Sequence, residues 1–160
     1  EHLEAQGETV VGGFLSPGHQ EYIDQKVRSN VSGLNLSASA RIAAVAAATA
    51  DSNWLSVDGW EALSAKVAVN FTDVYRRLCA YLKHHNVTAE VVFVVGADNA
   101  RFALTPNMRF AIVSRSDTPS AWGGDYRTKL QAHPNVTWVD TEVKASSSAV
   151  RSGQWEQVPE

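Results

Sequence analysis

Short apolar runs separated by helical segments constrain the fold of this chain more than any other feature of its sequence. The clearest run, Glu90 to Val95 (EVVFVV), is apolar almost throughout, which is typical of a strand buried on both faces of a sheet. Segments with helical periodicity lie before and after it. Strands that alternate with helices pair in parallel, because each connecting helix returns the chain to the same end of the sheet. The sequence therefore predicts an α/β protein.

Five such strands are expected, together with the helices that connect them. The strands are Thr9 to Leu15, Trp54 to Val57, Glu90 to Val95, Arg109 to Ser114 and Val136 to Val139. The helices are Ala38 to Ala50, a long amphipathic helix within Trp60 to His84, Asp98 to Leu104, Asp125 to Ala132, and one that opens at Ser146. This order is typical of a Rossmann-like fold, in which one mostly parallel sheet of about five strands is flanked by helices. With 160 residues, 44% of them apolar, the chain suits a single domain.

Composition excludes several classes of partner and site. The net charge of −3 includes no dense block of lysine and arginine, so neither nucleic acid nor an anionic membrane is the expected partner. No apolar run is long enough to cross a membrane and the first residues do not form a signal peptide, which together predict a soluble intracellular protein. Cys79 is the only cysteine and the five histidines lack metal-binding spacing, so no metal site built by the protein is expected.

A run of serines after the last expected strand is suited to phosphate. Ser146, Ser147 and Ser148 open a helix, and Arg151 lies one turn further on. Serine hydroxyls, the free N–H groups of a helix start and a guanidinium can together hold a phosphate group. The alternative is a plain helix cap, because serine runs are common there.

Two further strand ends carry candidates, each with an ordinary structural alternative. Gly96 would let a ligand approach the backbone directly after EVVFVV. Asp98 could accept hydrogen bonds from ribose hydroxyls or cap the next helix. Arg115 could face a phosphate or a nucleobase, or be a solvated arginine at a strand end.

A second group of candidates lies near the first two strands. Tyr22 and Lys26, beyond Ser16 at the end of the first strand, could reach an anionic substrate or be exposed loop residues. Glu61, after the second strand, could bond backbone groups near the start of the helix that follows that strand. No nucleophile with an adjacent base is evident, so the pattern favours the binding of nucleotides and phosphates over covalent catalysis.

In their order along the chain, these segments resemble the nucleotidylyltransferase superfamily, specifically the eukaryotic-type nicotinamide mononucleotide adenylyltransferases. The matching segments are VVGGFLSPGHQEY (Val10 to Tyr22), ADSNWLSVDGWEAL (Ala50 to Leu63), VVGAD (Val94 to Asp98), the strand end Ser114-Arg115, and SSSAVR (Ser146 to Arg151). They span nearly the whole chain. Each motif is weak alone, and their common order and spacing carry the resemblance.

The resemblance implies transfer of an adenylyl group from ATP to nicotinamide or nicotinate mononucleotide, a step of NAD biosynthesis, with Mg²⁺ bound to the ATP. It implies one set of residues that binds ATP, in which Arg151 also has a catalytic role: Gly96, Asp98, Ser146, Ser147, Ser148 and Arg151. It implies a second set for the mononucleotide: Ser16, Tyr22, Lys26 and Arg115.

The chain also departs from the family's pattern. The family begins with a strand carrying Gly-x-Phe-x-Pro and a histidine motif that stabilises the phosphates in the transition state. Both are missing if Gly12 to Pro17 (GGFLSP) is the second strand of the family, the alignment that also places Tyr22 and the Trp-Val-Asp-Trp-Glu block. The alternative alignment takes GGFLSPGH as a shortened form of the histidine motif, with His19 as its histidine. We follow the first and expect the first strand to be missing and residues 1–160 to form a nucleotidylyltransferase-like domain incomplete at both ends.

These departures leave a second class of function open. Lys26 is displaced from the position of the family's lysine-rich segment, and the aromatic side chains that stack on the nicotinamide have no clear match. The alternative is a catalytically degenerate domain retained as a structural or interaction subunit of a larger assembly, with protein partners or further copies of itself. A Gly-x-Phe-x-Pro strand and a histidine pair upstream of Glu1 would favour the enzyme.

Overall fold

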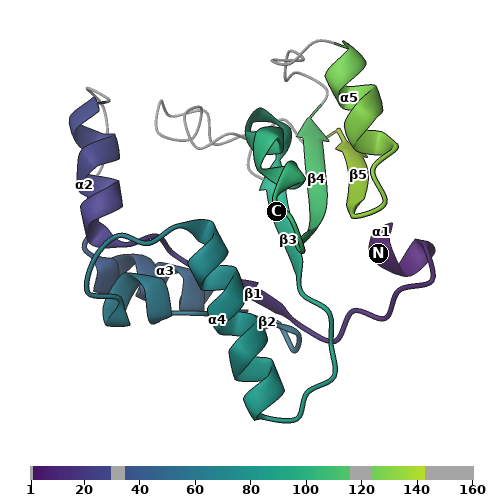
Figure 1. The fold of residues 1–160 in the computed structure, drawn as a ribbon. Helices are drawn as coiled ribbons and strands as arrows, with labels where there is room; N and C mark the ends of the chain where they lie inside the picture. The colour runs from purple at the N-terminus through teal and green to yellow at the C-terminus, as the bar shows by residue number, and fades with distance from the viewer. Residues whose placement is uncertain (1, 30–34, 116–123, 143–160) are drawn as a thin grey trace. The chain divides into compact units, whose positions relative to one another are not determined.

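Five parallel strands and their connecting helices make this an α/β protein, as expected from the sequence. The computed structural model describes residues 2–29, 35–115 and 124–142 (Figure 1). The chain divides into two compact units, residues 1–89 and residues 90–160. All strand pairs among the described residues are parallel, and they form a two-stranded sheet and a three-stranded sheet. The expectation of one five-stranded sheet was wrong in that respect, because apolar periodicity identifies strands but not the neighbours with which they pair.

The first unit holds the two-stranded sheet, in which β1 (Gly13–Leu15) pairs with β2 (Leu55–Val57). The described elements around them are α1 (His2–Ala5), α2 (Gln20–Ser29), α3 (Ala38–Ala48), the π-helical turn η1 (Trp60–Ser64) and α4 (Phe71–His84). Two expectations needed correction here. The strand expected over Thr9 to Leu15 is reduced to its last three residues, and α2 was not expected as a helix.

Local chemistry explains where the helices of this unit begin. The hydroxyl of Ser37 accepts a hydrogen bond from the backbone N–H of Ala40, so α3 starts at a capped end and continues through an alanine-rich sequence that favours helix. At the start of α4, the carboxylate of Asp73 accepts from the backbone N–H of Asn70. Both helices therefore begin where a short polar side chain satisfies a free N–H group.

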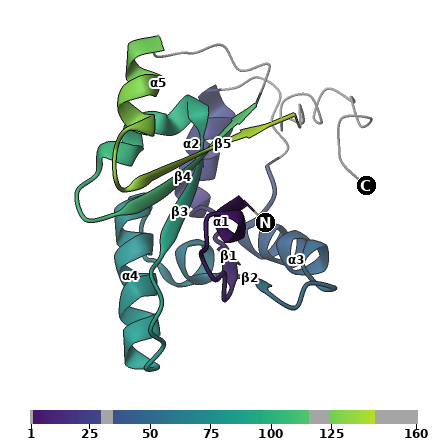
Figure 2. The same ribbon diagram turned by 90° about the vertical axis from the view of Figure 1, so that its right-hand side faces the viewer.

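The second unit is a sheet of three strands in the order β3-β4-β5. Its elements are β3 (Val92–Gly96), the 3₁₀ helix η2 (Ala97–Leu104), β4 (Arg109–Arg115), α5 (Gly124–Gln131) and β5 (Val136–Thr141). Right-handed connections between strands taken in sequence order place η2 and α5 on the same face of the sheet (Figure 2). The helix η2 packs on β3 and β4, and α5 packs on β5.

The core of the second unit forms between this face and its helices. Phe110 and Ile112 on the central strand β4 are completely buried, and the ring of Phe93 meets that of Phe110 edge-on with centroids 5.8 Å apart. Ala103 on η2 and Leu130 on α5 are each 1% exposed. Small residues on η2 let this helix lie close to the sheet. The close packing keeps the carboxyl ends of the strands of this sheet in fixed positions.

Candidate functional site

The carboxyl ends of β1 and β2 bring two loops together within the first unit. Because the strands are parallel, both end at the same edge, and the backbone N–H of Asp58 donates to the carbonyl of Leu15 at 2.9 Å. One loop is 16–19, between β1 and α2, and the other is 58–61, at the start of η1. Ligands of parallel α/β sheets bind at such edges.

Asp58 is the buried charge of this edge, with 9% of its side chain exposed. Nη1 of Arg77 lies 2.9 Å from its Oδ1 and 3.0 Å from its Oδ2, and the backbone N–H of Trp60 donates to Oδ1 at 3.2 Å. The guanidinium of Arg77 also lies over the rings of Trp60 and Tyr81, 5.5 Å and 5.4 Å from their centroids. A carboxylate this buried is tolerated because it is paired and hydrogen-bonded, and it thereby ties α4 to the end of β2.

A single peptide in the other loop is bound at both ends by charged side chains. The N–H of His19 donates to Oε1 of Glu61 at 3.0 Å, and Nη1 of Arg41 donates to the carbonyl of Gly18 at 2.6 Å. These two groups belong to the same peptide bond, Gly18–His19. Glu61 therefore bonds a backbone group at the start of α2, and not, as expected, at the start of the helix in which Glu61 itself lies.

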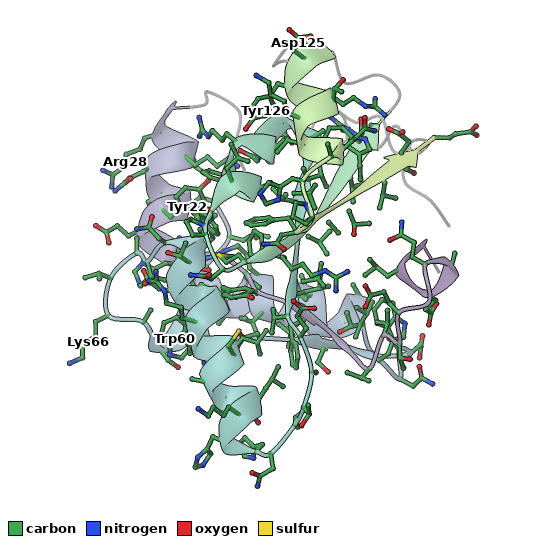
Figure 3. All side chains as sticks on the ribbon, turned by 45° about the vertical axis from the view of Figure 1, so that its right-hand side comes forward. Tyr22, Arg28, Trp60, Lys66, Asp125 and Tyr126 are labelled. Atoms are coloured by element: carbon green, nitrogen blue, oxygen red, sulfur yellow. The ribbon has the colours of Figure 1, made fainter. Side chains whose placement is uncertain are left out.

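The expected mononucleotide residues of the first unit lie on this loop and on the helix that follows. Ser16 is exposed in the loop, and Tyr22, 51% exposed, projects from α2 (Figure 3). Lys26 lies one turn further on, with Nζ 5.9 Å from the centroid of the Tyr22 ring. The structure therefore brings Tyr22 and Lys26 together on α2 and leaves Ser16 at the edge of the sheet.

Asp24 is the one described group of α2 whose pKa is clearly shifted. Hydrogen bonds from Gln20 and from Asn35 lower the pKa of its carboxyl from the ordinary value of 3.8, and the guanidinium groups of Arg28 and Arg41 act in the same direction. These contacts link α2 to the segment before α3, so Asp24 supports the helix rather than facing a ligand.

In the second unit, Gly96 and Asp98 lie at the end of β3. A Cβ on Gly96 would lie 2.5 Å from Oδ1 of Asp98, so the carboxylate of Asp98 lies directly over the glycine backbone. Oδ2 of Asp98 accepts from the side-chain amide of Asn99 at 3.2 Å, and the side chain is exposed. An exposed carboxylate at the end of a parallel strand is an acceptor that can receive a sugar hydroxyl.

Arg115 ends the neighbouring strand β4 at the same edge. Gly96 pairs with Val113, two residues before Arg115, and Arg115 pairs with Thr141 at the end of β5. The structure thus brings Gly96, Asp98 and Arg115 to one edge of the three-stranded sheet. Ser146, Ser147, Ser148 and Arg151 lie outside the described residues.

Sequence analysis missed a cluster at the end of β5. Oδ2 of Asp140 lies 2.7 Å from Nη2 of Arg127 on α5, and Oδ1 accepts from the indole N–H of Trp138 at 3.1 Å. The guanidinium of Arg127 lies 4.8 Å from the centroid of the Trp138 ring. The spacing Trp-x-Asp, which puts both side chains on one face of a strand, was the available signal.

Arg41 and Arg77 were also missed. Arg77 lies three residues after the buried Val74, and a charge on the buried side of an amphipathic helix indicates a buried partner. No comparable signal marks Arg41, because its acceptors belong to residues that precede it by up to 23 positions.

Residues 2–29, 35–115 and 124–142 contain neither a metal-binding cluster nor a membrane-spanning helix. Within them, no group of three or more His, Cys, Asp or Glu side chains could hold a metal ion. No helix of that part of the chain is both long enough and apolar enough to cross a membrane. Comparison with models of known protein families and with curated protein sequences found no match.

Proposed function

We propose that this chain is a nucleotide-binding domain of the nucleotidylyltransferase type, which binds ATP and nicotinamide or nicotinate mononucleotide for adenylyl transfer. The observation that supports it most is the end of β3, where the exposed carboxylate of Asp98 lies against the backbone of Gly96. Parallel α/β sheets bind their ligands beyond the carboxyl ends of the strands, and a carboxylate there can accept hydrogen bonds from ribose hydroxyls. Arg115 adds a cation at the same edge.

The proposal divides the polar residues between two ligands. Gly96 and Asp98 would bind the ribose of ATP, and Ser146, Ser147, Ser148 and Arg151 its phosphates. In the first unit, Ser16, Tyr22 and Lys26 would bind the mononucleotide. Lys26 beside the Tyr22 ring offers a cation and an aromatic surface to a ligand that carries a phosphate and a ring.

The reaction needs positioning and charge stabilisation rather than a covalent nucleophile. A phosphate oxygen of the mononucleotide attacks the α-phosphorus of ATP and forms a new P–O bond. The bond between the α-phosphorus and the oxygen that bridges it to the β-phosphate breaks, and pyrophosphate leaves. A guanidinium such as that of Arg151 would stabilise negative charge on the transferred phosphates. Mg²⁺ belongs to the proposal as an ion ligated by the ATP phosphates, and no described residue is assigned to it.

Calorimetric titration with ATP tests the proposed phosphate site. Removing a charge-assisted phosphate contact costs about 2–3 kcal/mol, so Arg151→Ala should weaken ATP binding by tens of fold. Arg76→Ala is the matched control, because this arginine side chain is 74% exposed on α4 and should leave the affinity unchanged. An unchanged affinity in Arg151→Ala would remove Arg151 from the site.

A degenerate domain with a structural role is the second candidate, and one observation favours it. At the end of β1 and β2, the charged side chains of Asp58, Glu61 and Arg41 bond other groups of the protein. Such contacts stabilise the fold and are what a domain with a structural role needs. If the domain is degenerate, the 160-residue chain should retain ATP affinity but form no measurable dinucleotide from ATP and nicotinamide mononucleotide, because ground-state contacts alone do not lower a barrier.

His19 makes that assay decisive between the two alignments. Its Nδ1 accepts from the backbone N–H of Glu21 at 3.2 Å, so its ring helps to cap α2. Robust turnover that is abolished by His19→Ala would show instead that the segment GGFLSPGH is the catalytic motif.

A further inference from the structure

We propose that Arg41 and Glu61 are positioning residues for the mononucleotide: together they fix the Gly18–His19 peptide and, through it, the loop and helix that carry Ser16, Tyr22 and Lys26. This inference rests on the proposed function. Neither residue touches the ligand in this proposal. Their effect on binding passes through one peptide plane.

Two hydrogen bonds hold the plane of the Gly18–His19 peptide. A peptide unit is planar, so an acceptor on its N–H and a donor on its C=O fix the rotation of the whole plane. Glu61 supplies the acceptor from η1 at 3.0 Å and Arg41 the donor from α3 at 2.6 Å. The bond from Arg41 comes from a guanidinium, and a hydrogen bond from an ionised donor is stronger than a neutral one.

Each of the two side chains is itself held. Nη2 of Arg41 donates to Oε1 of Gln20 at 3.0 Å, and its Nε donates to the carbonyl of Leu36 at 3.2 Å, so the guanidinium spans the loop and the start of α3. Glu61 follows Trp60, whose backbone N–H is bound by the buried carboxylate of Asp58. The two bonds to the peptide therefore come from fixed points on separate elements.

The fixed peptide in turn sets the position of the ligand-facing residues. An ideal Cβ on Gly18 would lie 3.4 Å from Cδ1 of Tyr22 and 3.5 Å from Oε1 of Glu61, so no more than the space of a methyl group separates the loop backbone from the tyrosine ring. Nζ of Lys26 lies 5.9 Å from the centroid of that ring. A rotation of the Gly18–His19 plane would displace the Tyr22–Lys26 pair relative to Ser16.

The required property of Glu61 is an acceptor oxygen, not a negative charge. The amide oxygen of glutamine can accept from the His19 N–H at the same position, whereas leucine has similar bulk and no acceptor. Glu61→Gln should therefore retain the function that Glu61→Leu loses. Arg41→Lys keeps the charge but cannot bond the Gly18 carbonyl, the Gln20 side chain and the Leu36 carbonyl together.

The test measures three quantities on wild type and these variants: calorimetric affinity for nicotinamide mononucleotide, affinity for ATP, and the midpoint of thermal unfolding. Glu61→Leu is expected to weaken mononucleotide binding about tenfold and Arg41→Lys about fivefold, with Glu61→Gln within about twofold of wild type. ATP affinity should stay within about twofold in all of them. Circular dichroism shows which variants are folded. If Glu61→Leu does not fold, the mononucleotide affinity of Arg41→Lys decides the test.

The outcomes separate this inference from the proposed function. If wild type binds neither ligand, the proposed function and this inference both fall. If wild type binds both ligands and neither Glu61→Leu nor Arg41→Lys changes mononucleotide affinity, the inference falls and the proposed function stands. Equal losses in Glu61→Gln and Glu61→Leu would mean that the carboxylate acts on the ligand by its charge, which also overturns the positioning role.

Discussion

The two sheets of this chain share parallel pairing and differ in what stabilises them. In the three-stranded sheet, Phe110 and Ile112 on β4 have no exposed surface. In the two-stranded sheet, Phe14 and Leu15 on β1 remain 45% and 43% exposed. Burial of apolar side chains therefore stabilises the three-stranded sheet, while hydrogen bonds from charged side chains between loops contribute more to the stability of the two-stranded sheet.

Polar residues at the strand ends differ in the same way. Beside β1 and β2, Asp58 is 9% exposed and forms part of the internal framework. At the edge of the three-stranded sheet, Asp98 is exposed and Asp140 has 62% of its side chain exposed. The unit with a packed core keeps its strand-end carboxylates at the surface, even where one is paired as Asp140 is with Arg127, whereas the unit with exposed strands buries Asp58 and uses it to hold itself together.

The largest expected effect comes from the packed core. Phe110→Ala should lower the free energy of unfolding by about 3–5 kcal/mol, because it removes a fully buried ring and leaves a cavity. Phe14→Ala, the same change on a half-exposed strand, should cost about 1 kcal/mol. Urea unfolding measures both. Equal losses would erase the distinction between the two sheets.

A smaller loss is expected from the buried ion pair. Asp58→Ala should destabilise the protein by about 2–3 kcal/mol, less than for a fully buried pair because 32% of the Arg77 side chain is exposed. The control is Asp140→Ala, which breaks the exposed pair with Arg127 and should cost about 0.5 kcal/mol. A double-mutant cycle with Arg77→Met sharpens the assignment, since the coupling energy isolates the pair. Losses of the same size in Asp58→Ala and Asp140→Ala would contradict the larger contribution of the buried pair.

The strand-end glycine should give an effect of about 1 kcal/mol. Gly96→Ala places a Cβ 2.5 Å from Oδ1 of Asp98, and the flexible carboxylate must move away. In the background of Asp98→Ala, the same change should be neutral or slightly stabilising, because alanine also has less conformational freedom in the unfolded chain. Thermal unfolding of the single and double variants measures the difference. A full cost that persists without the Asp98 carboxylate would place the clash elsewhere.

The smallest effect is pH-dependent. Hydrogen bonds from Gln20 and Asn35 hold the pKa of Asp24 below 3.8, so its contribution to stability is present above that pH and is lost as the pH falls through the lower folded pKa. Asp24→Asn should therefore lower the unfolding midpoint slightly at pH 7, and the difference from wild type should vanish in acid. Asn35→Ala removes one of the donors and should reduce the pH dependence without abolishing it. A difference that grows on acidification would contradict the assignment.

Sequence alone predicted the second unit better than the first. β3, β4 and β5 were expected within about two residues of their observed ends, because continuous apolar runs mark strands directly. The expectation that the EVVFVV strand is buried on both faces was wrong, since Val94 on β3 is 64% exposed. α2 was missed because its sequence is mostly polar, and the contacts of Gln20 with Arg41 and of His19 with Glu61 link it to distant residues. Such partners have no local signature.

The candidate site follows the same division. The pairing of Tyr22 with Lys26 could be expected from their spacing of four residues once a helix is known, and Gly96 and Asp98 follow directly from the end of an obvious strand. Arg41 could not be predicted, because its role depends on how the chain folds back onto residues 18–20. Long-range hydrogen bonds are determined by the fold and not by periodicity.

The doubly bound peptide between β1 and α2 also bears on the entropy of binding. A loop residue that is free in the folded protein must lose about 1–2 kcal/mol of backbone entropy when a ligand orders it. At Gly18–His19 that loss has already occurred during folding, because Arg41 and Glu61 hold the plane before any ligand arrives. A ligand at this edge would meet a preorganised surface, and more of its contact energy would appear as affinity.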